Sequence, residues 1–125
     1  MAIALNIIHL GESPFVVQQM QGDVDNTKVP AGTTLGTATQ LGAAINDLAT
    51  TPSGAGVLLP SNATSLGDEI FIYNASSANA CKVYPALATE NINNAGVGVA
   101  YSLTASKSAT FTRTQALGWR AVLSS

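Results

Sequence analysis

The chain has 125 residues and a mass of 12.7 kDa, which is the size of one domain and enough to bury a hydrophobic core without disulfides or metals. Only 10% of its residues are charged, against about 25% in an ordinary soluble domain. The net charge is −2 and the Lys and Arg residues are scattered, so no nucleic-acid partner is expected. Low charge with many small polar side chains suits a surface that is partly buried in an assembly.

The N-terminal segment, residues 2–20, is predicted to form two extended runs, residues 3–10 and 15–20, on both sides of a turn at residues 11–14; residues 2–10 are apolar apart from Asn6 and His9. Its first run, residues 3–10, is either a strand or an arm laid on a neighbouring subunit. That run is too short to span a bilayer and lacks the basic start of a signal peptide, so no membrane partner is expected. The side chains predicted to contact another protein chain of an assembly are Ile3, Leu5, Ile7, Ile8, Leu10, Phe15 and Val17. Residues 1–36 are therefore interpreted as an N-terminal arm followed by a loop.

Residues 37–55 are predicted to contain one short helix and a hinge. Apolar residues recur there at the spacing of one helical face, which predicts a helix over residues 39–50. Thr37 or Thr39 would cap its start, and Pro52 would end it. The residues on the shared face are Leu41, Ala44, Ile45 and Leu48.

Residues 56–125 are predicted to form a β module of short strands. The run Ile-Phe-Ile-Tyr at residues 70–73 is apolar on both faces, which predicts a central strand covered on both sides. Residues 81–84 alternate in polarity and are expected to form a hairpin with that run, because the residues between them are small and polar. Alternation is cleanest over residues 97–103, and it returns in residues 109–113 before a last strand.

Short strands separated by turn signals predict an all-β fold. The expected form is a small antiparallel β-sandwich or barrel with one short helix and an extended N-terminal arm. Periodicity leaves the choice between sandwich and barrel open. The side chains predicted for the structural core are Ile70, Ile72, Val83, Val97, Val99, Phe111 and Trp119.

The sequence contains no convergent set of catalytic side chains. His9 is the only histidine, and Cys81, the only cysteine, lies in an apolar run where a free thiol is normally buried. Asp23, Asp25 and Asn26 lack the spacing of an EF-hand and are interpreted as a solvated turn. No enzymatic activity, metal or cofactor is expected.

Aromatic side chains on the predicted strands offer one further alternative, a face that binds sugars. Each has apolar neighbours on its own face of a strand, so the core and subunit contacts are the favoured interpretation. The four side chains concerned are Tyr73, Tyr84, Tyr101 and Trp119.

The order of short motifs from residue 56 onward resembles a β module of tailed-bacteriophage virion proteins. The motifs are GVLLP, GDEIFIYN, KVYP, NIN, SLTASKSATF and a terminal Gly-Trp pair, Gly118 and Trp119. The module is similar to those in capsid decoration (cement) proteins and in head or tail fibre proteins. The resemblance covers residues 56–125, whereas residues 1–55 match no such motif.

This resemblance implies a structural protein of the virion with no active site to carry over. The expected protein is a homotrimer that binds the major capsid protein and stabilises the outside of the capsid, with residues 2–20 as the anchoring arm. It would reside on the capsid surface, and in the host cytoplasm during assembly. The alternative is a head or tail fibre module that binds a host-surface glycan.

Overall fold

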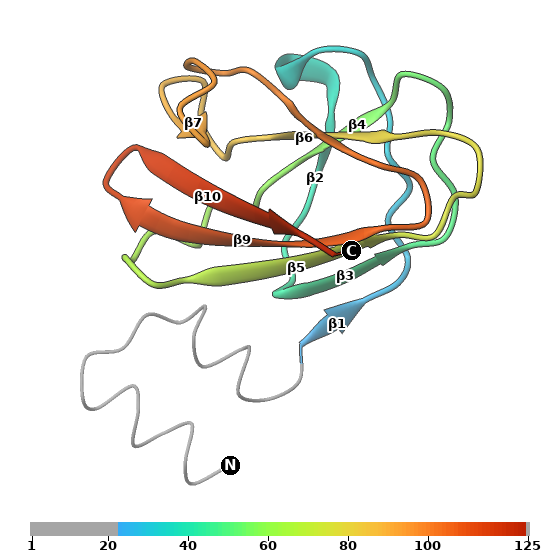
Figure 1. Cartoon of the computed structure of the whole chain (residues 1–125), viewed down its shortest axis with the longest axis horizontal. Coiled ribbons are helices and arrows are strands. Elements are labelled where there is room, and N and C mark those ends of the chain that lie inside the picture. The colour runs from blue at the N-terminus through green and yellow to red at the C-terminus, as the bar shows by residue number, and fades with distance from the viewer. Residues whose placement is uncertain (1–22, 125) are drawn as a thin grey trace, which may run out of the picture.

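Two β-sheets make up the fold, which a computed structural model describes for residues 23–124 (Figure 1). The six-stranded sheet has the order β1-β3-β5-β9-β10-β7, and the four-stranded sheet has the order β2-β4-β6-β8. The strands of the six-stranded sheet are β1 (Val24–Asp25), β3 (Ile45–Leu48), β5 (Glu69–Asn74), β7 (Asn91–Ile92), β9 (Ser108–Gln115) and β10 (Gly118–Leu123). Those of the four-stranded sheet are β2 (Thr39–Gln40), β4 (Gly56–Leu58), β6 (Cys81–Tyr84) and β8 (Tyr101–Leu103). The expectation of an all-β fold is confirmed for these residues.

Successive strands from β1 to β9 alternate between the two sheets. A chain that crosses to the other sheet after each strand returns in its original direction two strands later, so β1, β3 and β5 pair in parallel, as do β2, β4 and β6. β7 also runs parallel to β10, whereas β9 is antiparallel to β5 and β10, and β8 is antiparallel to β6. The prediction of an antiparallel fold is therefore wrong for much of the described chain.

The expected hairpin between residues 70–73 and 81–84 is also wrong, because β5 and β6 lie in different sheets. The side chain of Asn74, at the end of β5, is buried and fixes the crossing. Its amide nitrogen donates to the carbonyl oxygens of Asn79 at 2.9 Å and Leu103 at 3.2 Å, and its oxygen accepts from the Thr51 hydroxyl at 2.8 Å. Small polar residues at 75–80 thus make a connection between layers rather than a hairpin turn.

The predicted helix over residues 39–50 is wrong as well. This stretch forms β2, a turn and β3, and the described chain has helical geometry only in the 3₁₀ turn η1 (Leu35–Thr37). Leu41, Ala44 and Leu48 are buried in the core, and β2 and β3 pair with β4 and β5. Thr, Asn and Gly are poor helix formers, so pairing with neighbouring strands decides the conformation.

The hydrophobic core contains buried side chains from both sheets. Of the predicted core, Ile70, Ile72, Val83, Phe111 and Trp119 are fully buried. The prediction is wrong for two residues before β8: Val97 is 68% exposed and Val99 is 46% exposed. Gly96 and Gly98 have φ angles of 122° and 71°. These turn conformations interrupt the alternating stretch, so β8 begins only at Tyr101.

The segments interpreted as loop and as helix and hinge contribute β1, β2 and β3. β1 pairs with β3, while β2 and β3 pair with β4 and β5 of the predicted β module, so both sheets include strands from residues 1–55. The predicted interface residues of the N-terminal arm lie outside the described residues. They are Ile3, Leu5, Ile7, Ile8, Leu10, Phe15 and Val17, and His9 lies with them.

Candidate interaction surfaces

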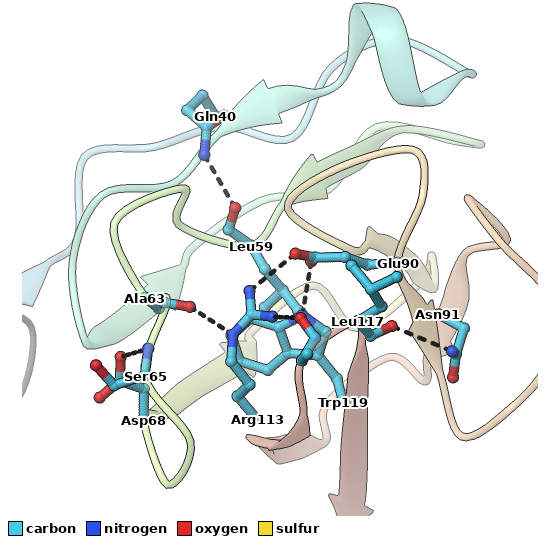
Figure 2. A network of polar contacts seen from close by, with 11 residues as sticks. Gln40, Leu59, Ala63, Ser65, Asp68, Glu90, Asn91, Arg113, Leu117 and Trp119 are labelled. Atoms are coloured by element: carbon cyan, nitrogen blue, oxygen red, sulfur yellow. Dashed lines mark hydrogen bonds and ion pairs between the residues drawn. The ribbon is translucent and has the colours of Figure 1, made fainter.

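A buried polar network holds one end of the two-sheet structure together (Figure 2). Arg113 occupies an inward position of β9, two residues after Phe111, and its side chain is almost fully buried. Its Nε donates to the carbonyl oxygen of Ala63 and one terminal nitrogen donates to that of Ala116, both at 2.8 Å. The guanidinium therefore joins the β4–β5 loop to the β9–β10 turn.

Glu90 completes this network by pairing with both Arg113 and Trp119. One carboxylate oxygen accepts from the Arg113 guanidinium at 2.9 Å, and the other accepts from the Trp119 indole nitrogen at 3.0 Å. The guanidinium also lies 4.6 Å from the centre of the Trp119 ring, within cation–π range. These contacts give the buried charge both a counter-ion and hydrogen-bond partners, as burial of an ion requires.

The loops held by this network expose large apolar side chains to solvent. Leu66 lies in the β4–β5 loop, Leu87 in the β6–β7 loop and Leu117 in the β9–β10 turn. Backbone hydrogen bonds connect these loops to the network: Glu90 N donates to the Leu87 oxygen, and Asn91 N donates to the Leu117 oxygen. We call these three leucines the loop-end leucines.

The outer face of the six-stranded sheet carries a second apolar surface, which we call the outer row. Residues directly opposite each other on neighbouring strands share a face. The register therefore aligns one residue from each of five strands: Val24, Ile45, Phe71, Thr110 and Val122. Val24 is 58% exposed, Phe71 is 38% exposed and Val122 is 70% exposed. Four of the five members are apolar, so the row is a mainly apolar stripe, interrupted by Thr110 between Phe71 and Val122.

The outer row corrects the expectation that β5 is covered on both faces. Within residues 23–124, Ile70 and Ile72 face the core, whereas Phe71 and Tyr73 face outward and remain partly exposed. Polar rows flank the stripe, with Glu69, Thr112 and Arg120 aligned on one side. The stripe is thus a defined apolar surface within a polar face.

Two titratable groups of the described chain, Asp25 and Cys81, have shifted pKa values. Within residues 23–124, no group of three His, Cys, Asp or Glu side chains is placed to hold a metal ion, and these residues enclose no pocket. Burial raises the pKa of the Cys81 thiol to about 12. Hydrogen bonds from the hydroxyl and backbone of Thr27 lower the pKa of Asp25, so its carboxylate stabilises a local turn.

The aromatic residues considered for a sugar-binding face do not share one exposed face in the described chain. Of the four aromatic residues considered for a sugar-binding face, Trp119 and Tyr84 are buried, and Tyr101 packs edge-on against Phe111 at 5.4 Å between ring centres. Only Tyr73 is exposed on the outer face. The sequence pattern did not predict the outer row, because its members come from distant strands and only the sheet register aligns them.

Comparison of the chain with protein-family models, with curated proteins and with solved structures finds no match. No helix within residues 23–124 has the length and apolar character needed to cross a membrane.

Proposed function

We propose that this protein is a structural component of a tailed-phage virion, a decoration protein that binds the outside of the capsid as a homotrimer and stabilises it. It acts by burying apolar surface against the major capsid protein, without catalysis. The finer fold assignment that accompanies this proposal is a β-sandwich with an extended N-terminal arm. Residues 2–20 are the anchoring arm.

The outer row is the observation that carries this proposal. Exposed apolar patches of this kind mark sites of protein association. The row begins at Val24, and only three residues separate it from the N-terminal segment that ends at Met20, so the two lie close together along the chain. The loop-end leucines are further exposed apolar side chains on three separate loops, and a protein that joins several subunits needs more than one contact. The motif order of residues 56–125 and the low charge content agree with this role.

Co-sedimentation with capsids tests the proposal. The full chain should pellet with purified capsids of the phage that encodes it. Ile8→Asp places a charge in the proposed anchor and should weaken binding by at least about tenfold, because an unpaired buried charge is costly. The matched control is Ser102→Asp, at an exposed outward position of β8 on the other sheet, and should bind normally. Equal binding of both variants would refute the anchoring arm, and absence of binding by the natural chain would refute the function.

A host-surface glycan receptor is the second candidate, favoured by the exposure of two aromatic side chains on one face of β5. Phe71 and Tyr73 stand two residues apart and both are accessible. Rings exposed in this way offer stacking surfaces for sugars. If this function holds, the natural chain should bind host cells or their surface polysaccharide in a pull-down, and Tyr73→Ala should abolish that binding. Capsid binding without glycan binding would exclude it.

A further inference from the structure

We propose that, in the free protein, the chain's own N-terminal segment lies across the outer face of the six-stranded sheet and covers the outer row. The proposal concerns the protein before it meets a partner, and it does not depend on the virion function. Its occupant is residues 2–20 of the same chain.

The first argument is where the segment joins the fold. β1 is the edge strand of the six-stranded sheet, and Val24, its first residue, is one end of the outer row. Asp23, just before it, is fixed to the neighbouring strand: its backbone oxygen accepts from Ile45 N at 3.1 Å, and its carboxylate accepts from Ala44 N at 3.1 Å. The segment therefore leaves the sheet at the edge where the row begins.

The second argument is reach. The row crosses five adjacent strands, a distance of about 19 Å at the usual strand spacing. An extended chain of about six residues covers that distance. The 22 residues before Asp23 are therefore long enough to cross the row and return.

The third argument is chemical match. Within residues 1–22, Glu12 is the only acidic side chain and there is no Lys or Arg, so the segment carries little charge to desolvate. Its apolar residues include Ile3, Leu5 and Ile7. Burying large aliphatic side chains against an apolar stripe is favourable by about 1.5–3 kcal/mol for each side chain fully covered.

The fourth argument is competition between occupants. A tethered segment meets the row at an effective concentration in the millimolar range, whereas a second copy that is not already part of the same oligomer is present only at its solution concentration. At micromolar protein the tethered segment therefore wins unless the second copy binds far more tightly. This argument selects the segment over self-association through the row.

Cysteine alkylation in the full-length chain tests the proposal, since Cys81 is buried and contributes little background. Thr110→Cys places a thiol within the outer row. Ser102→Cys places the matched thiol at an exposed position of β8, on the four-stranded sheet. Each variant is made with the natural segment and with Ile3, Leu5 and Ile7 changed to Ser, and is treated with N-ethylmaleimide.

Loss of the apolar side chains should speed alkylation at position 110 by about tenfold, because the thiol is protected only while it is covered. Alkylation at position 102 should not change. The rate at position 110 should also be independent of protein concentration. A second full-length variant, Phe15→Ser with Val17→Ser, should deprotect position 110 in the same direction.

Two results would overturn the proposal. Equal alkylation at position 110 with natural and substituted segments would show that the segment does not cover the row. Protection that grows with protein concentration, together with a rising mass in light scattering, would assign the row to a second copy. Neither result depends on capsids, so co-sedimentation separately decides the virion function.

Discussion

Arg113 is a charged residue at a position of β9 that the alternating pattern assigns to the core. Its burial is possible because Glu90 neutralises it, while the carbonyl oxygens of Ala63 and Ala116 accept two of its other hydrogen bonds. The sequence shows Arg113 as the end of an alternating run, but Glu90, a distant residue in a turn-rich stretch, gives no local sign that it is the partner. The pair could not be found from the sequence because its members are brought together only by the fold.

Glu90→Gln should strongly destabilise the protein. The substitution leaves the Arg113 guanidinium buried without a counter-ion, and removal of one partner of a buried pair costs about 3–5 kcal/mol. Urea denaturation followed by Trp119 fluorescence measures the change. Glu69→Gln, at an exposed position of β5, is the control and should change the free energy of unfolding by less than about 0.5 kcal/mol. Similar losses in both variants would contradict a structural role for the pair.

Cys81 should be inert in the folded protein at pH 8, because burial raises its pKa to about 12 and keeps the thiol protonated. This raised pKa also makes stability depend on pH. The folded state favours the protonated thiol, so its contribution is complete below the ordinary value of 9.0 and is lost as the pH rises towards 12. The free energy of unfolding, measured by denaturation between pH 8 and 11, should fall more steeply with pH for the natural chain than for Cys81→Ala. Parallel curves would contradict the prediction.

At the scale of elements, the four-stranded sheet depends on the close approach of its parallel strands β4 and β6. A methyl group at Gly56 in β4 would lie 2.7 Å from the Lys82 carbonyl oxygen and 2.9 Å from the Tyr84 ring, both in β6. Gly42, in the turn between β2 and β3, has nothing within 4 Å of the same position. Glycine is thus required where β4 passes β6, but not in the turn.

Gly56→Ala should therefore destabilise the fold by about 1–3 kcal/mol, the usual cost of forcing extra atoms into a packed core. Gly42→Ala is the matched control and should be neutral or slightly stabilising, because it restricts the unfolded chain without a clash. Thermal denaturation of both variants measures the difference. A similar melting temperature for both would show that β4 and β6 can separate without cost.

Local pattern predicted individual strands better than it predicted their pairing. β5, β6, β9 and β10 were recognisable from their own residues, since half-buried strands alternate and buried runs are apolar. The pattern could not reveal that β5 and β6 belong to different sheets, because a hairpin and a crossing connection use similar small polar residues. It also gave a false helix at residues 39–50, where a turn between two short strands reproduces helical spacing.

At the scale of the whole molecule, the low charge of the chain now has a structural counterpart. Some of the exposed apolar side chains are aligned in the outer row, and others, such as the loop-end leucines, lie on loops. Composition suggested a surface buried in an assembly, but only the strand register placed Val24, Phe71 and Val122 in one row. The candidate surface is thus a property of the complete fold.

If the proposed trimer forms, light scattering of the purified full-length protein should give three times the chain mass of 12.7 kDa. The mass should persist on dilution to about micromolar concentration, as expected for a permanent oligomer whose interface is large and apolar. A single chain mass throughout that range would contradict the trimer. In that case the capsid and alkylation experiments would describe a monomer.

The alternation of strands between sheets also determines how this chain must fold. Among the strand pairings within residues 23–124, only β9 with β10 joins strands adjacent in the sequence. Every other pairing must close a longer loop before its contacts form, which makes folding slow, in the range of milliseconds to seconds. During synthesis, β5 acquires its β9 neighbour only after more than thirty further residues have left the ribosome. The six-stranded sheet is therefore completed only after β9 and β10 have been synthesised.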